Sequence, residues 1–203
     1  MSFTEPIDAT GYDFHSWIRF AFDHPVSDNP WYYTEEMYFV CDPENVITFY
    51  TRLFQDPQST LSSYDDAHIE QGLWFIVGSQ LNDWLWDDEH PLQLRLDCIA
   101  AMPMMFRNFL VEHPLETACF MWWDMLRSFG DDPNASIVGA MIRALEEVLQ
   151  LPTRHLQMSA LHGLGHLKHE SKERIIRSLL LANAEIDEEM REYAENAIAG
   201  TTL

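Results

Sequence analysis

The sequence predicts an all-α protein, an antiparallel helix stack or short α-solenoid built from helix pairs. Three observations lead to this prediction. Apolar residues recur with helical periodicity along most of the chain after residue 40. Prolines stand at or just before the starts of these periodic segments, where the first helical turn tolerates a missing N–H. No convincing alternation of apolar and polar residues, the pattern of a half-buried strand, follows residue 40.

We expect a single domain over residues 1–203, organised in three parts. Residues 1–40 are rich in aromatic side chains, and we expect a helix near 14–22, an irregular loop, and a role as a cap on the first helices or as a binding face. Residues 41–151 form a helical body, and residues 152–203 form a pair of repeats.

The helical body has clear helix starts. Asp42 is placed to cap a helix whose first residue is Pro43. The carboxylates of Asp65-Asp66 mark the start of a second helix, because negative charge is favourable at the positive end of a helix dipole. We expect helices over residues 43–54, about 65–81, 92–111, 115–129 and 135–151. Pro103 should kink or split the third of these.

The last fifty residues predict three helices, over 154–167, 172–182 and 188–198. The first and third share a pattern at an offset of 34 residues. Small residues at two of the four positions would allow neighbouring helices to approach closely, and large ones would fill the space between them. The matching pairs are Leu156 and Met190, Ala160 and Ala194, Gly163 and Ala197, and Leu164 and Ile198.

The sequence Ser-Ala-Leu-His-Gly-Leu-Gly-His-Leu at 159–167 resembles the first helix of HEAT-like repeats, including the short type first noticed in phycobilisome lyases. In those repeats an Ala-Leu-x-x-Leu-Gly core is followed by a turn and an apolar second helix. Arg191 stands where many such repeats carry arginine. The resemblance covers residues 152–203, and it implies a fold without implying a function. The apolar positions of the second helix are Ile175, Ile176, Leu179 and Leu180.

Charge is the most unusual property of the composition. The net charge is −21, and residues 1–90 hold 17 acidic residues against two arginines. Such a field repels phosphate backbones and anionic lipid, and it attracts basic proteins. No apolar run approaches the roughly 20 residues that span a bilayer. We therefore predict a basic protein partner, no nucleic acid and no membrane.

The same half of the chain holds 19 of the 26 aromatic residues. Aromatic side chains can anchor a protein interface while carboxylates steer a basic partner. The mixture is of the type found in bacterial immunity proteins that neutralise nuclease toxins, although each tryptophan could instead belong to the core. The candidate partner-binding residues are Trp31, Tyr32, Tyr33, Trp84, Trp86, Asp87, Asp88 and Glu89.

Four histidines form the alternative candidate site. His155, His162, His166 and His169 should share one helix face away from the main apolar face. Imidazoles at positions i and i+4 can bind one Zn²⁺, so a metal-dependent enzyme, or a metal or pH sensor, is the alternative function. The chain has no His-Glu-x-x-His motif, and a polar face packed partly against a neighbour explains the row equally well.

No catalytic motif is present in the sequence. The chain lacks a GxSxG sequence and a Gly-rich phosphate loop, and its acidic pairs suit helix caps. Cys41, Cys98 and Cys119 are too few and too widely spaced for a disulfide framework or a metal pair, which suits buried thiols in a reducing cytoplasm. The N-terminus lacks the layout of a signal peptide. We therefore expect a non-enzymatic, cytoplasmic binding protein without a cofactor, an immunity or inhibitor protein in its most specific form, or a small regulatory scaffold.

Overall fold

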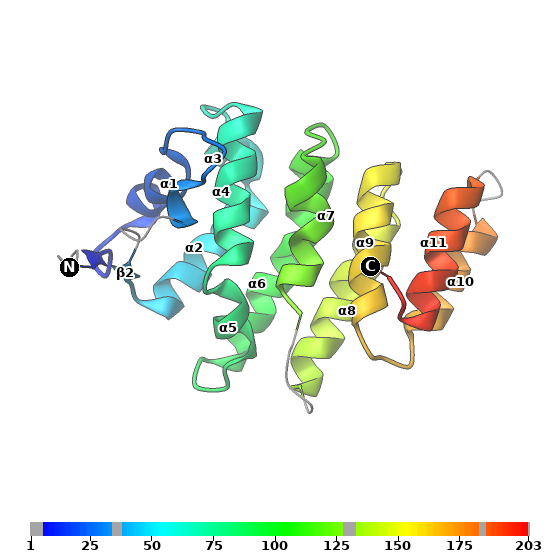
Figure 1. Ribbon diagram of the computed structural model, residues 1–203. Helices are drawn as coiled ribbons and strands as arrows, with labels where there is room; N and C mark the ends of the chain where they lie inside the picture. Colours follow the sequence, from blue (N-terminus) through cyan, green and yellow to red (C-terminus); the bar gives the residue numbers. More distant parts are fainter. Residues whose placement is uncertain (1–5, 34–37, 128–132, 183–185, 203) are drawn as a thin grey trace.

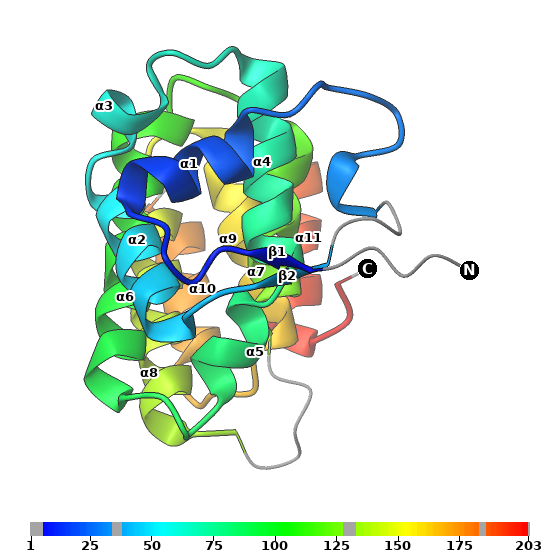
Figure 2. The same cartoon turned by 90° about the vertical axis from the view of Figure 1, so that its left-hand side faces the viewer.

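The computed structural model describes residues 6–33, 38–127, 133–182 and 186–202. These residues form the predicted all-α stack, in which helices pack in two layers (Figures 1 and 2). One layer contains α4 (Asp66–Gly78), α7 (Glu116–Met125), α9 (Arg154–His166) and α11 (Glu188–Ala199). The other layer contains α2 (Pro43–Gln55), α6 (Leu92–Met105), α8 (Ala135–Leu149) and α10 (Lys172–Ala182).

The N-terminal segment covers one end of the stack (Figure 2). It comprises α1 (Phe14–Phe22), the short 3₁₀ helix η1 (Trp31–Tyr33), and two short strands, β1 (Ile7–Asp8) and β2 (Phe39–Val40). The helix at 14–22 is confirmed, and Asp13 caps it by accepting a hydrogen bond from the Ser16 N–H at 2.8 Å. The parallel pairing of β1 with β2 was not predicted, because two-residue strands leave no periodic pattern in a sequence.

The predicted start of α2 is confirmed. Asp42 accepts hydrogen bonds from the N–H groups of Glu44 at 3.1 Å and Asn45 at 3.3 Å, and Pro43 is the first helical residue. A short helix that was not predicted, α3 (Pro57–Leu61), uses the same device with Asp56 and Pro57. The helix expected over about 65–81 instead ends at Gly78, and a separate helix, α5 (Leu81–Trp86), follows.

Pro103 neither splits nor ends its helix. Helix α6 continues through it and then widens into a π-helical turn, η2 (Phe106–Leu110), in which the Val111 N–H bonds to the Phe106 carbonyl at 3.1 Å. Pro103 is buried, and α6 packs against both α2 and α8, so these contacts compensate for the missing hydrogen bond.

The three C-terminal helices begin and end close to the predicted residues. Helices α9 and α11, which carry the pattern at a 34-residue offset, lie next to each other in one layer. All the paired residues are buried except Ile198, which is half-buried. Arg154 at the start of α9 joins the two helices by ion pairs to Asp187 at 3.0 Å and Glu189 at 2.7 Å.

Two smaller expectations concern thiols and membranes. Cys98 and Cys119 are buried and Cys41 is half-buried, and all three are free thiols. Burial raises the pKa of the Cys98 and Cys119 thiols to about 12, so neither is a reactive thiolate at neutral pH. None of the described helices combines the length and the apolar composition needed to cross a membrane.

Candidate functional site

The predicted aromatic partner-binding residues are mostly part of the core. Trp31 and Trp84 are each only 8% exposed, and Trp31 stacks on His24 at 3.7 Å between ring centroids. Tyr32 is half-buried, whereas Tyr33 is 68% exposed. The burial of Trp31 and Trp84 contradicts a role as surface anchors. Trp31 packs on Phe75 of α4 at 4.6 Å between ring centroids, and Trp84 is one of the buried residues of α5.

Trp86 is also engaged inside the protein. Its side chain is half-buried, and its Nε1–H donates a hydrogen bond to the Leu126 carbonyl at 2.9 Å. The bond joins the end of α5 to the end of α7, so it has a structural role. Of the five aromatic candidates, only Tyr33 presents most of its surface to solvent.

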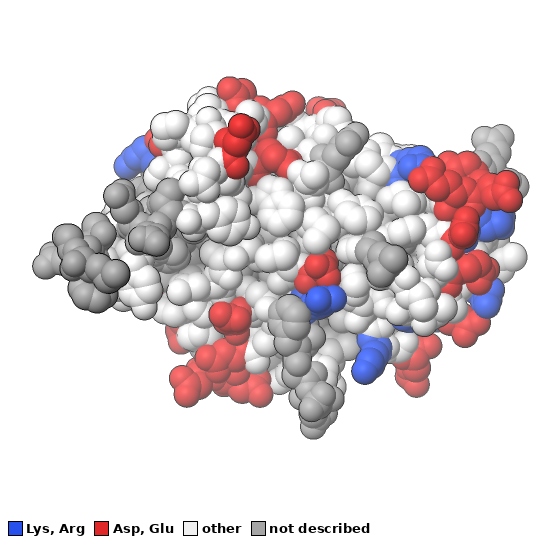
Figure 3. All heavy atoms as spheres, viewed as in Figure 1, with Lys and Arg blue, Asp and Glu red and all other residues white. Residues whose placement is uncertain are grey.

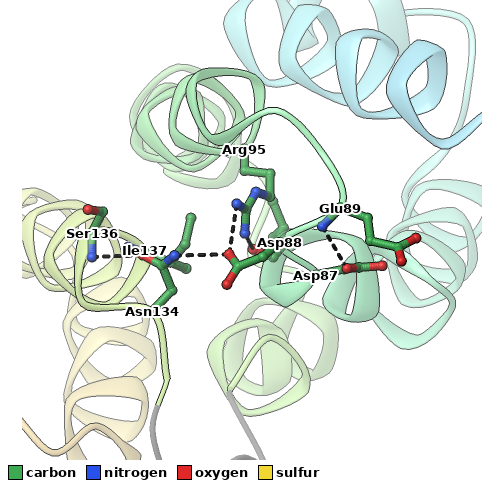
Figure 4. Close-up of polar contacts among 8 residues, drawn as sticks. Asp87, Asp88, Glu89, Arg95, Asn134, Ser136 and Ile137 are labelled. Atoms are coloured by element: carbon green, nitrogen blue, oxygen red, sulfur yellow. Dashed lines mark hydrogen bonds and ion pairs between the residues drawn. The ribbon is translucent and has the colours of Figure 1, made fainter.

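All three acidic residues after α5 are exposed, but only Asp88 also contacts other helices (Figure 4). Asp88 pairs with Arg95 at 3.0 Å and accepts a hydrogen bond from the Asn134 side-chain amide at 3.0 Å. Arg95 is 2% exposed, and its positive charge together with Asn134 holds the pKa of Asp88 below its usual value. Asp88 therefore ties the loop to α6 and to the start of α8, and because its side chain is still 72% exposed, its assignment as a partner contact stays a prediction.

Asp87 and Glu89 remain on the surface. The Asp87 carboxylate accepts a hydrogen bond from the Glu89 N–H at 2.9 Å, which shapes the turn. Both side chains are exposed, and Figure 4 shows their carboxylates turned away from Arg95. These two residues keep the surface position that the prediction gave them.

Ion pairing is distributed unevenly along the described chain. Within its described ranges, each pair between an arginine and a carboxylate uses a carboxylate at position 88 or later. The two arginines of the first 90 residues are engaged otherwise, since Arg52 lies over the Phe14 ring at 3.9 Å and Arg19 bonds to Ser16 at 3.3 Å. In the view of Figure 3, carboxylates gather near both ends of the α4 and α5 region and around α11, and the centre of the face is mostly uncharged.

The four histidines do not form one face of a helix. Helix α9 ends at His166, so His169 lies in the following turn, where its Nδ1 accepts a hydrogen bond from the Ser171 N–H at 3.2 Å. The His155 Nε2 atom lies 3.1 Å from the Leu110 carbonyl oxygen, at the other end of α9. The structure brings together only His162 and His166.

His162 is buried, contrary to the expectation of a row away from the core. Its side chain is 3% exposed, because α7 and α11 cover α9 on this side. The Phe120 ring lies 4.3 Å from the imidazole between ring centroids, and the Tyr193 hydroxyl lies 2.7 Å from its Nδ1. Nδ1 is thereby occupied, and Nε2 is directed toward His166.

Asp124 of α7 joins the two histidines in a compact cluster. The Nε2 atoms of His162 and His166 are 3.3 Å apart, and the His166 Nε2 lies 3.3 Å from Asp124 Oδ1. The three ligand atoms all lie within 4.8 Å of one another. Asp124 Oδ1 is buried, and none of its neighbours has the direction required for a hydrogen bond.

Arg127 supplies the positive charge beside this cluster. Its Nη1 lies 3.1 Å from Asp124 Oδ1 and 3.3 Å from the His166 Nδ1. Burial, the neighbouring His166 and Arg127 lower the pKa of His162 to about 4, against the attraction of Asp124. Burial, Arg127 and Lys172 likewise lower the pKa of His166. Both imidazoles are therefore neutral at pH 7.

The low pKa of His162 predicts an acid-sensitive contribution to stability. The unfolded chain binds a proton at this side chain below about pH 6.5, whereas the folded protein binds it only near pH 4. Stability is thus lost as the pH falls from 6.5 toward 4. With a chelator present, the wild type should lose about 1–2 kcal/mol more between pH 7 and pH 5 than His162→Gln, measured by urea unfolding. Equal losses in the two proteins would contradict this assignment.

Three members of the cluster were missed by sequence reasoning, namely Asp124, Arg127 and Tyr193. They come from α7, the turn after it, and α11, and no sequence spacing connects them to α9. Only the packing of the three segments brings them together.

No protein-family model matches the chain, and no curated protein or solved structure is significantly similar to it.

Proposed function

We propose that this protein is a non-enzymatic binding module whose acidic N-terminal half engages a basic protein partner. The observation that carries the proposal is the uneven ion pairing. Carboxylates of the C-terminal half are partly neutralised by arginines of the same chain, whereas those described before residue 88 are not paired with arginine or lysine. Uncompensated surface charge speeds the encounter with a partner of opposite sign and fixes its orientation.

The surface around the end of α5 is the best defined part of this region. Asp83, Asp87 and Glu89 are exposed, and Asp88 anchors the loop that carries two of them through the buried Arg95. A fixed loop presents its carboxylates without the entropy loss that a flexible one suffers on binding. Tyr33 and Tyr38 lie in the same half of the chain, and both are exposed aromatic side chains available for a contact.

An inhibitor or immunity protein is the narrower form of this proposal. Nucleases and other enzymes that bind nucleic acid carry basic surfaces, and an acidic protein can cover such a surface. The support is the charge and its location, together with a rigid helical scaffold. A cytoplasmic location fits three free thiols, and it remains part of the proposal.

A charge-removal experiment tests the proposal. The triple variant Asp83→Asn, Asp87→Asn and Glu89→Gln removes three exposed charges near α5. The control Glu170→Gln, Glu188→Gln and Glu192→Gln removes three exposed charges from the C-terminal half. We expect a basic protein to be captured by the wild type at low salt and by the control, with capture lost at high salt and in the α5 variant.

Two results would contradict the proposal. One is that no basic protein is captured by the wild type at low salt. The other is that the two triple variants bind a captured protein equally well, because total charge rather than the α5 surface would then explain the capture. Circular dichroism of both variants shows whether the fold is intact.

A further inference from the structure

We propose that Asp124, His162 and His166 bind a single transition-metal ion of the Zn²⁺ class, and that Arg127, which pairs with the same Asp124 oxygen, competes with the ion for this carboxylate. The proposal is independent of the acidic binding surface. It joins two imidazoles one helical turn apart on α9 with a carboxylate from α7.

The separations of the ligand atoms fit a tetrahedral site. Bonds of about 2.0–2.1 Å from Zn²⁺ to nitrogen and oxygen, at tetrahedral angles, place neighbouring ligand atoms about 3.3–3.5 Å apart. The two separations that involve the His166 Nε2 are both 3.3 Å, one to His162 and one to Asp124. The third is at most 4.8 Å, so a small rotation of one side chain completes the set.

The surroundings of His162 favour coordination through Nε2. The Tyr193 hydroxyl lies 2.7 Å from Nδ1, so Nδ1–H can donate to it and leave the Nε2 lone pair toward the cluster. Such outer contacts orient metal-binding histidines and fix their tautomer. Phe120 covers the imidazole ring and helps to fix its plane.

The Asp124 oxygen provides a second, independent indication of a ligand. It is buried and receives no well-directed hydrogen bond, although Arg127 and His166 lie within 3.3 Å of it. A buried carboxylate oxygen without a hydrogen bond is costly, and a cation bound to it removes that cost. Asp124, His162 and His166 are therefore arranged for a cation while the guanidinium only partly fills that role.

Arg127 opposes the ion and makes the site selective. Its Nη1 lies 3.3 Å from the His166 Nδ1, which must carry a hydrogen when Nε2 binds a metal. The guanidinium must therefore withdraw from His166 when the ion enters. Lys172, whose Nζ lies 3.4 Å from the Gly165 carbonyl oxygen, adds positive charge nearby. The site should thus bind only an ion whose affinity for the three ligands exceeds its repulsion by Arg127 and Lys172.

Titration of the chelator-treated full-length protein with Zn²⁺ and Co²⁺ tests the proposal. We expect one equivalent of Zn²⁺ by calorimetry and the visible absorption of four-coordinate Co²⁺. His166→Ala and Asp124→Asn should each weaken Zn²⁺ binding at least about tenfold. Arg127→Gln should strengthen it, because the competing charge is gone. His155→Ala and His169→Ala, at histidines outside the cluster, serve as matched controls and should bind as the wild type does.

Three outcomes would overturn the inference. These are the absence of one-equivalent binding, retention of full affinity in both His166→Ala and Asp124→Asn, or loss of binding in the controls alone. His166 and Asp124 are chosen because His162 is more deeply buried and its removal could unfold the protein. Unfolding curves of the metal-free variants separate loss of the site from loss of the fold.

Discussion

Replacing Trp122 by alanine should lower the free energy of unfolding by about 3–5 kcal/mol, the range observed for large aromatic residues in protein cores. The side chain is fully buried on α7. It contacts Phe54 of α2 at 5.3 Å and Phe106 of η2 at 5.5 Å between ring centroids, both with edge-to-face geometry. Trp122 therefore fills the space between the two helix layers, and its removal leaves a cavity that rigid helices cannot close.

Two further substitutions sharpen this prediction. Trp122→Phe keeps an aromatic ring and removes a buried Nε1–H that has no hydrogen-bond acceptor, so we expect a cost of only about 1–2 kcal/mol. Trp74→Ala removes a half-buried tryptophan of α4 and should also cost less than Trp122→Ala. Urea unfolding followed by circular dichroism measures all three. Equal costs for Trp122→Ala and Trp74→Ala would show that Trp122 does not join the layers.

The helices could be predicted because their signals are local. Helix α1 was predicted without its capping residue, Asp13. The start of α2 was predicted from Asp42 as the cap and Pro43 as the first helical residue, and both have these roles in the structure. Pro103 shows the limit of local rules. Its effect on α6 depends on the packing of this helix against α2 and α8, and a sequence does not reveal that packing.

The candidate site was harder to predict than the fold. The spacing of His162 and His166 correctly indicated neighbours on a helix, but the apolar pattern of α9 placed both away from the core, and His162 is buried. That side is decided by α11, whose Tyr193 reaches His162. The position of Asp124 beside these histidines could not be predicted for the same reason. The relative rotation of α7 and α9 depends on side-chain packing along their whole contact.

The acidic candidates were chosen by residue type and composition. These properties do not distinguish a carboxylate that holds elements of the fold together from one that makes no such contact. Asp87, Asp88 and Glu89 are adjacent and chemically alike, yet only Asp88 meets a buried arginine. Arg95 lies seven residues further along the chain, on α6, and the turn between the two residues determines the pairing. Composition therefore does not distinguish these three carboxylates, whereas the contacts show which of them is tied to the rest of the fold.

Replacing Gly163 by alanine should lower the free energy of unfolding by about 1–3 kcal/mol, although alanine is the better helix former. Gly163 lies at the close approach of α9 to α7 and α8. A Cβ atom there would clash with Trp123 Cβ and lie 2.8 Å from Leu145 Cδ2. Because Trp123 Cβ is attached directly to the α7 backbone, the clash can be relieved only by moving the two helices apart.

Gly139→Ala is the matched control for this substitution. Gly139 is inside α8, where the nearest atom to a new Cβ is the flexible end of Arg143 at 3.4 Å. Alanine there should raise the free energy of unfolding by about 0.5–1 kcal/mol. The two glycine substitutions should thus shift the urea midpoint in opposite directions, and shifts of the same sign would contradict the close approach of α7 and α9. Because Trp123 precedes Asp124 and Gly163 follows His162, Gly163→Ala should also separate the proposed metal ligands and weaken Zn²⁺ binding, whereas Gly139→Ala should not.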